Sequence, residues 1–251
     1  STFPVPASQD ELLSRLRQAL AMAPRPLPEV PGVPLAGGLV GFTAYDVVRF
    51  FEKLPTRHPR RPEAPILHYV APQSLLVFDH LTRGIALLHA GSEAERQSLR
   101  REVIRALRGG LPSENGKGGH SPAEASMSQA QFLDGVARTK EYIAAGDVYQ
   151  LVLAARFVGR HALDPFQVYR ALRLINPSPY MFYVKLGELT VVGSSPEALV
   201  KLDARGQAEL RPIAGTRPRA ADPELDRQRE RELLADPKEN AEHVMLVDLA
   251  R

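Results

Sequence analysis

Two glutamates near the end of the chain, Glu239 and Glu242, are spaced so that they could bind a divalent cation together. Asp236 followed by Pro237 is typical of a helix start, because Asp caps free N–H groups and Pro suits the first turn. In such a helix the two glutamate side chains lie one turn apart on one face. Carboxylate oxygens suit Mg²⁺, but the helix dipole also favours an acidic first turn without a metal. On spacing alone, the solvated acidic turn is the simpler interpretation.

The segment 211–219 carries groups that could bind an anionic small molecule. Prolines stiffen it on both sides, Gly215 permits a ligand to approach the backbone closely, and Thr216 supplies a hydroxyl. Its surroundings attract carboxylates because they contain three arginines, Arg211, Arg217 and Arg219. We predict that this segment is the tip of a hairpin. A Gly-Thr turn is also compatible with an ordinary hairpin connection that binds nothing.

Several strands must position these groups. The segment 146–157 predicts a turn followed by a strand rich in β-branched and apolar residues, and 176–186 predicts a Pro-punctuated loop that enters another strand. A strand at 189–193 then leads into a turn at 194–197, with a further strand at 198–202. Taken alone, Glu197 would be an exposed turn carboxylate.

In this order and at this spacing, these segments resemble the chorismate-utilising enzymes, and among them most closely the component I chains of anthranilate synthase. The resemblance is carried by GDVYQLVLAARF, NPSPYMFYVKL, VVGSSPEALVKL, RPIAGTRPR and DPKENAEHVMLVDLAR. An upstream segment, GGLVGFTAYDVVR, is similar to the N-terminal region of that family. The resemblance covers nearly the whole chain from about Gly37 onward.

The resemblance implies a fold of the α+β class, a large layered αββα sandwich with mostly antiparallel sheet. We expect the chain to hold only part of it, without the N-terminal start and without the C-terminal half of the catalytic domain. Residues 1–108 would belong to an N-terminal regulatory region, 109–125 would form a flexible Gly/Ser/Pro-rich linker, and 126–251 would be the first half of the chorismate-binding domain.

Helical periodicity and cap signals predict three helices before the strands begin to dominate. The expected helices cover 9–21, 93–107, and a stretch that a Ser128–Gln131 capping box opens and Gly146 ends. A Pro-rich connector reaching about residue 34 follows the first of them. Short strands expected at 66–70, 74–79 and 84–90 would form an antiparallel meander.

Two positions narrow the reaction that the resemblance implies. Family members that add water to chorismate carry a lysine base where this chain has Gln150, which cannot act as a base. Aminodeoxychorismate synthases typically carry a nucleophilic lysine where this chain has Ala214. Together the two residues favour addition of ammonia at ring carbon 2, which gives anthranilate and pyruvate. Either residue could instead serve only in packing.

The resemblance also implies roles for individual residues. Glu197 would be the general acid that protonates the departing hydroxyl, which requires a raised pKa. Ala214, Gly215 and Thr216 would contact the substrate, with Gln150 and Thr216 also in the catalytic set. The implied cofactor is Mg²⁺, with Glu242 as its ligand and Glu239 close by. The family's ring-proton base and further metal ligands would lie beyond Arg251.

The family's regulation and partners follow from the same resemblance. Tryptophan, the feedback inhibitor, would bind a pocket completed by Asn176, Pro177, Ser178, Pro179, Tyr180 and Met181. A glutamine amidotransferase subunit would supply ammonia, in the first step of tryptophan biosynthesis. Two alternatives stay open: an aminodeoxychorismate synthase of folate biosynthesis, and a catalytically inert fragment. We expect this piece alone to be inactive.

Composition excludes several other classes of protein. The net charge is only +3 and the basic residues are interspersed with acidic ones, which disfavours a nucleic-acid partner. Because the chain has no cysteine, it cannot form disulfides or thiolate metal sites. No long apolar segment indicates membrane insertion, and we expect a cytoplasmic protein.

Overall fold

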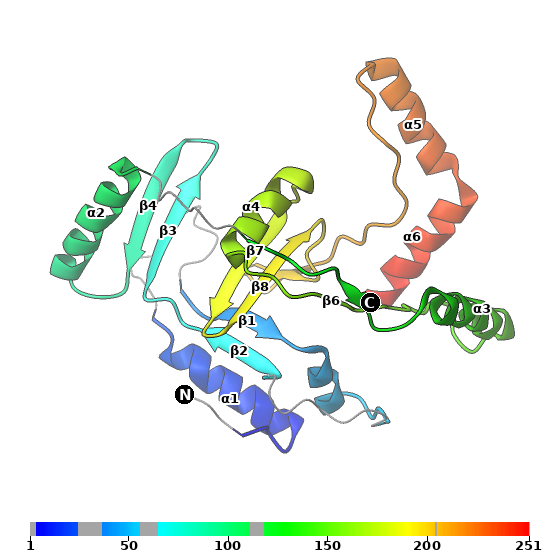
Figure 1. Cartoon of the computed structure of the whole chain (residues 1–251), viewed down its shortest axis with the longest axis horizontal. Helices are drawn as coiled ribbons and strands as arrows, with labels where there is room; N and C mark the ends of the chain where they lie inside the picture. The colour runs from blue at the N-terminus through cyan, green and yellow to red at the C-terminus, as the bar shows by residue number, and fades with distance from the viewer. Residues whose placement is uncertain (1–3, 25–36, 56–64, 111–117, 204, 251) are drawn as a thin grey trace. The chain divides into compact units, whose positions relative to one another are not determined.

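The computed structural model describes residues 4–24, 37–55, 65–110, 118–203 and 205–250 (Figure 1). The chain divides into two compact units. Unit 1 comprises Ser1–Glu114 and Val184–Thr190, and unit 2 comprises Asn115–Tyr183 and Val191–Arg251. Most of the predicted Pro-rich connector and the middle of the predicted 109–125 linker lie outside the described residues. The division into a regulatory region, a linker and a catalytic region stays a prediction.

Unit 1 contains two separate pairs of antiparallel strands. The pairs are β1 (Val40–Thr43) with β2 (Leu67–Val70), and β3 (Ser74–Asp79) with β4 (Gly84–His89). The three predicted strands are present, but the predicted meander is wrong because β2 pairs with β1 and not with β3. Strand β1, which sequence patterns did not predict, offers β2 a partner from Val40 opposite Val70 to Thr43 opposite Leu67.

The two α-helices of unit 1 begin where side chains can cap them. Helix α1 (Gln9–Met22) starts after Ser8, whose hydroxyl accepts the N–H of Glu11. A short 3₁₀ helix, η1 (Tyr45–Phe50), follows β1. Helix α2 (Glu93–Arg108) opens with a reciprocal capping box between Ser92 and Glu95. The helices predicted at 9–21 and 93–107 are therefore confirmed.

The first helix of unit 2 was predicted from the sequence, and its last two helices follow one another directly. Helix α3 (Gln129–Ala145) has the expected Ser128–Gln131 capping box and ends at Gly146, whose φ of 81° suits glycine. The other helices are α4 (Pro165–Ile175), α5 (Pro223–Ala235) and α6 (Pro237–Leu249). Sequence patterns predicted α6 but neither α4 nor α5.

The strands of unit 2 are short apart from one hairpin. That hairpin joins β7 (Tyr180–Leu186) to β8 (Leu189–Ser195) through a turn at Gly187, and its tip is counted in unit 1. Aromatic contacts seat α4 on β7, with the Phe166 and Tyr183 rings 5.4 Å apart. Two-residue pairs make up the rest: β5 (Glu124–Ala125) with β6 (Phe157–Val158), and β9 (Lys201–Leu202) with β10 (Ala208–Glu209).

Two strand predictions in unit 2 are wrong, and the reason is the same. An extended segment becomes a strand only where a second backbone pairs with it. In the part of the chain that the structure describes, only Phe157 of the predicted 146–157 strand finds such a partner, and only Lys201–Leu202 does so in 198–202. The segment 211–219 has no regular secondary structure and is not the tip of a hairpin. The hairpin lies just before it, where Asp203 accepts the N–H groups of Arg205 and Gln207.

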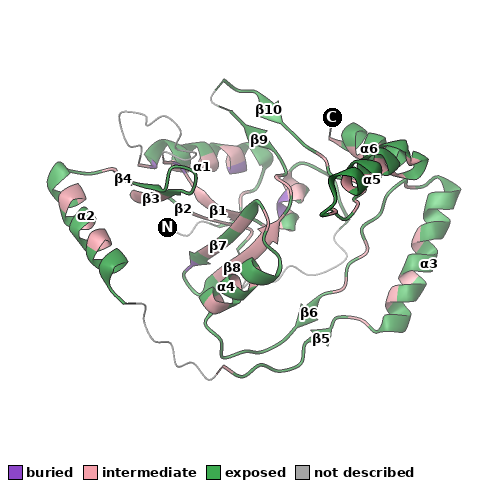
Figure 2. Ribbon diagram, turned by 90° about the horizontal axis from the view of Figure 1, so that it is seen from above, coloured by how far each residue is buried: buried purple, intermediate pink, exposed green. Residues whose placement is uncertain are grey.

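Burial is unequal between the two units (Figure 2). The buried apolar side chains of the described residues are Leu12, Ala23, Val47, Leu88 and Leu186, and all five belong to unit 1. None of the described residues of unit 2 is buried, although its helices and strands carry many apolar side chains. All the candidate site residues therefore lie in the unit without a core of its own.

Candidate functional site

The start of α6 is built as the sequence predicts. Asp236 caps the helix by accepting the N–H groups of Lys238 at 3.0 Å and Glu239 at 3.3 Å, and Pro237 occupies the first turn. These bonds, first that from the N–H of Glu239, hold the pKa of the Asp236 carboxyl below its usual range, and Arg217 adds to the effect. The cap places Glu239 and Glu242 on α6 as predicted.

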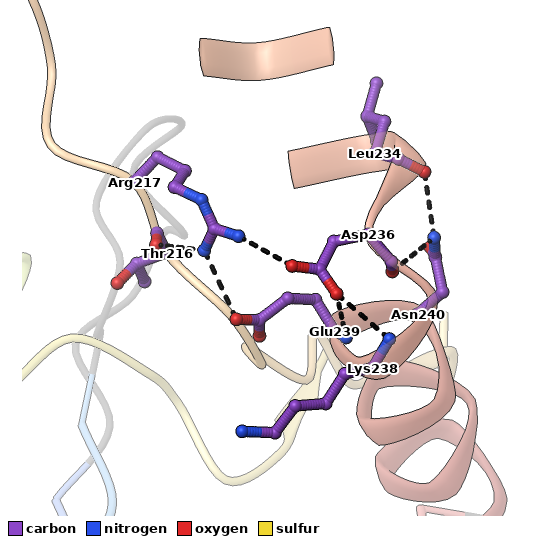
Figure 3. Close-up of polar contacts among 7 residues, drawn as sticks. All are labelled: Thr216, Arg217, Leu234, Asp236, Lys238, Glu239 and Asn240. Atoms are coloured by element: carbon purple, nitrogen blue, oxygen red, sulfur yellow. Dashed lines mark hydrogen bonds and ion pairs between the residues drawn. The ribbon is translucent and has the colours of Figure 1, made fainter. Parts of the chain in front are cut away.

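Asp236 also ends the preceding helix, so α5 and α6 are joined through a single residue. The free carbonyl groups at this junction are satisfied by Asn240, whose amide donates to the carbonyl oxygens of Leu234 at 2.8 Å and Asp236 at 2.9 Å (Figure 3). Because Asp236 both ends α5 and caps α6, it fixes the direction in which α6 leaves α5.

The segment 211–219 lies directly against the start of α6. The Arg217 guanidinium donates to Asp236 Oδ2 at 2.9 Å and to Glu239 Oε1 at 3.2 Å, as Figure 3 shows. Its Nη1 also donates to the carbonyl of Thr216 at 3.0 Å. A Cβ atom at Gly215 would fall 1.8 Å from Glu239 Oε2, so only glycine permits this approach. The two motifs that sequence reasoning singled out therefore meet.

The arginines of this segment are already engaged with carboxylates of the protein. Arg219 forms a two-pronged ion pair with Asp226 of α5, at 2.7 Å in its shorter contact, and Asp226 also accepts the N–H of Ala220. These contacts, that from Arg219 first, lower the pKa of Asp226. Arg211 pairs with Glu209 on the surface. Two of the three arginines thus anchor the segment to α5 and α6.

The glutamate pair differs in its surroundings. Glu239 is half-buried and paired with Arg217, whereas Glu242 is exposed and forms no hydrogen bond or ion pair with the described residues. Within the described ranges, no group of three or more His, Cys, Asp or Glu side chains could hold a metal. Glu239 and Glu242, two carboxylates one turn apart on α6, nevertheless fit an Mg²⁺ ion, which takes one or two protein carboxylates and keeps several waters.

Glu197 lies in a turn that is tied to the predicted tryptophan loop. The Ser195 hydroxyl donates to the carbonyl of Glu197 at 2.8 Å, and the Ser194 hydroxyl donates to the carbonyl of Asn176 at 2.6 Å. The loop 176–181 runs from the end of α4 into β7, with Ser178 and Met181 half-buried. None of the described hydrogen bonds or ion pairs links Glu197 to the α6 carboxylates.

Gln150 is exposed, and the residue before it reaches α6. Tyr149 lines an open groove together with one face of α6, formed by Ala241, Val244, Met245, Val247 and Asp248. The groove brings the 146–157 segment beside the helix that carries Glu239 and Glu242. Neither Gln150 nor Ala214 makes a side-chain hydrogen bond among the described residues.

Sequence reasoning missed the central contact of the site, the Arg217 pairing with Asp236 and Glu239. It treated Arg217 as a binder of external carboxylates and Asp236 as a cap alone. A signal was present, because an arginine inside a Pro-bounded segment near an acidic helix start is a natural ion-pair donor. The helix α5 that brings them together was not predicted.

Residues 2–251 match the family model described as chorismate binding enzyme. The chain belongs to this family. Among chorismate-binding relatives, it is 43% identical to anthranilate synthase component 1 of Thermus thermophilus, over 99% of the chain and 54% of that protein. It is 40% identical to anthranilate synthase component 1 of Streptomyces coelicolor, over 99% of the chain and 51% of that protein.

A solved structure of the same family shares the fold. The crystal structure of anthranilate synthase component I from Streptococcus pneumoniae TIGR4 superimposes with a TM-score of 0.76 at 30% identity, covering 94% of this chain and 53% of that one. The predicted α+β class and the family's layered fold are thereby confirmed. The chain spans about half the length of the curated relatives it matches. No helix of the described residues is long and apolar enough to cross a membrane.

Proposed function

We propose that the full-length protein is the chorismate-binding component of an anthranilate synthase. The observation that carries the proposal is the identity of 43% and 40%, across 99% of the chain, to two proteins named anthranilate synthase component 1. The reaction converts chorismate and ammonia into anthranilate, pyruvate and water, as the first step of tryptophan biosynthesis. A glutamine amidotransferase subunit is the partner that supplies the ammonia, and the location is cytoplasmic.

The residues of this chain have distinct roles in that reaction. The Gly215 backbone and the Thr216 hydroxyl bind the substrate, next to Ala214. Glu197 protonates the carbon-4 hydroxyl as ammonia attacks carbon 2, and the hydroxyl leaves as water. Gln150 cannot deprotonate water, which keeps ammonia as the nucleophile. Loss of the ring proton and of pyruvate then completes the aromatic product.

The metal part of the proposal rests on the α6 carboxylates. Glu242 is the carboxylate that would hold Mg²⁺, with Glu239 beside it. When bound, Mg²⁺ would screen the negative charge of the substrate's ring carboxylate. The exposed side chain of Glu242, one turn from Glu239 on the same helix, supports this assignment.

The activity is tested by identifying the product. Full-length protein given chorismate, Mg²⁺ and ammonium should form fluorescent anthranilate and an equal amount of pyruvate. Accumulation of 4-amino-4-deoxychorismate in place of anthranilate would overturn the proposal in favour of the folate branch. Tryptophan at millimolar concentration should inhibit the reaction through the 176–181 loop, and unchanged activity would remove that part of the proposal.

The metal assignment is tested by Glu242→Gln in the full-length protein. The amide keeps the size of the side chain but removes its charge, so the variant should lose most of its Mg²⁺-dependent activity, by about a hundredfold. Glu230→Gln, an exposed glutamate on α5, is the matched control and should keep its activity. An unaltered metal requirement in Glu242→Gln would show that the ligand assignment is wrong.

A further inference from the structure

The ion pair at the start of α6 holds the positive Arg217 guanidinium against Glu239, one of the two carboxylates assigned to the metal. Arg217, Asp236 and Glu239 are all partly shielded from water, with 29%, 31% and 22% of their side chains exposed. A guanidinium can serve two carboxylates at once because its N–H groups form a rigid planar fork. Arg217 uses this geometry, since its Nη2 donates to Asp236 and its Nη1 to Glu239 (Figure 3).

Arg217 occupies one of the two oxygens of Glu239 in this arrangement. Oε1 accepts from Arg217, and Oε2 lies against the backbone of Gly215. The Thr216 carbonyl holds the same guanidinium nitrogen in place at 3.0 Å. For a cation that approaches α6, Glu242 therefore has no described partner, whereas Glu239 is already paired with Arg217.

The charges put Arg217 and a divalent cation in competition for Glu239. One arginine facing two carboxylates leaves a single net negative charge, and Glu242 adds another on the next turn of the helix. A divalent cation is attracted by these carboxylates and repelled by the guanidinium between them. Glu239 can offer both of its oxygens to a cation only after it leaves Arg217, which can keep its bond to Asp236.

We propose that Arg217 is the internal counterion of Glu239, which a divalent cation displaces when it binds. This inference rests on the metal part of the proposed function and adds a residue to it. Arg217 weakens metal binding by competing for the carboxylate.

The experiment measures binding of Mn²⁺ to the full-length protein without chorismate, by isothermal titration calorimetry and by electron paramagnetic resonance. Arg217→Gln removes the competing charge, so its Mn²⁺ dissociation constant should fall by about two- to fivefold, as expected for loss of one partly exposed ion pair. A merely structural role for Arg217 would have the opposite sign, because a disordered Glu239 binds metal less tightly.

The matched control is Arg219→Gln, which removes an arginine two residues away that pairs with Asp226 of α5 and not with α6. Its Mn²⁺ affinity should stay within about twofold of wild type. Circular dichroism and the melting temperature check that the variants fold. Arg217→Lys is the second variant, since a compact ammonium cannot span both carboxylates and should give a smaller shift in the same direction.

The outcomes separate this inference from the proposed function. Unchanged or weaker Mn²⁺ binding in the folded Arg217 variants overturns the counterion role and leaves the metal assignment intact. If Arg217→Gln does not fold, the sign of the shift in Arg217→Lys decides the question. If wild-type protein binds no Mn²⁺, both the counterion role and the metal assignment are wrong. Anthranilate formation, assayed on the same preparations, reports on the proposed activity independently.

Discussion

Gly215 and Glu239 lie next to each other, and this contact makes the segment 211–219 sensitive to the addition of a single methyl group at Gly215. An added Cβ would overlap the Glu239 carboxylate, with 1.8 Å to Oε2 and 2.4 Å to Cδ. Because the overlapped atoms belong to the end of a flexible side chain, the protein can relieve the clash by moving Glu239. The cost then falls on the geometry of the site more than on the stability of the fold.

We therefore predict that Gly215→Ala in the full-length protein lowers anthranilate formation by tenfold or more, on the order expected for an ångström-scale misplacement. The melting temperature should change by only a few degrees. Gly119→Ala is the control, because a Cβ there meets nothing within 4 Å. Activity retained in Gly215→Ala would show that Glu239 need not hold its observed position.

Gln150 supports a second prediction at the residue scale. Gln150→Lys places an amine in an exposed position, where it should fold normally. If Gln150 contributes to ammonia addition, the variant should lose kcat by about tenfold or more while KM for chorismate changes little. Steady-state kinetics of the full-length enzyme give both constants. A wild-type kcat would mean that Gln150 has only a packing role.

Sequence patterns located the separate groups of the site but not the ion pairs that join them. The Asp236-Pro237 start of α6 is a local signal and was predicted. The Arg217 contacts with Asp236 and Glu239 join residues 19 and 22 positions apart, across a helix that was not predicted. The charges of these residues and their positions in the sequence do not predict such a contact, because it forms only once α5 turns the chain back on itself.

At the scale of elements, helix α2 shows how surface charges make a helix sensitive to acid. Arg96, and then Gln97, hold the pKa of Glu93 at about 2, below its ordinary 4.5. The hydroxyl and N–H of Ser92 likewise lower the pKa of Glu95. In the unfolded chain both glutamates take up protons near pH 4.5, while in the folded helix both do so at lower pH, Glu93 at about 2. The stabilisation from Glu93 is therefore present above pH 4.5 and is lost as the pH falls toward 2.

We predict that Glu93→Gln makes thermal stability less sensitive to acid. Between pH 6 and pH 3 the melting temperature of the full-length variant should fall less than that of wild type, since the titrating carboxylate is gone. Glu102→Gln, in the same helix but without a described hydrogen-bond partner, is the control and should follow wild type. Equal acid sensitivity in all three proteins would contradict the prediction. Circular dichroism gives the measurements.

Elements with a local signal were predicted better than those without one, although α4 and α5, which start at Asp164-Pro165 and Asp222-Pro223 caps, were missed. Helices α1, α2, α3 and α6 carry caps within their own sequence, and the β7–β8 hairpin is bounded by Gly187. Strand β1 and the short pairs of unit 2 depend on a partner far along the chain, which no local pattern identifies. The hairpin predicted at 211–219 was wrong for the same reason, since the neighbours of this segment are helix side chains and not a second strand.

At the scale of the whole molecule, unit 2 leaves much of its apolar surface open. Val152, Leu174, Ile175 and Leu199 are more than 80% exposed, whereas all five buried apolar residues of the described chain are in unit 1. Apolar faces of this extent mark surfaces that another segment or subunit covers. The matched relatives are about twice as long as this chain.

We predict that the 251-residue chain, expressed alone, is inactive and aggregates. It should elute near the void volume in size-exclusion chromatography and bind the dye ANS strongly, because unit 2 exposes apolar faces. The full-length protein, prepared in parallel, should elute as a defined species with weak dye binding. A monodisperse and active 251-residue chain would contradict both parts of the prediction.

The β7–β8 hairpin has a consequence for the order in which the protein can fold during synthesis. Its tip, Val184–Thr190, belongs to unit 1 and contributes the buried Leu186, yet it is made only after Asn115–Tyr183 of unit 2. At roughly 5–20 residues per second, that intervening stretch takes on the order of ten seconds to emerge. Unit 1 therefore cannot complete its core until Leu186 has been synthesised. The nascent chain passes through a period in which neither unit is complete.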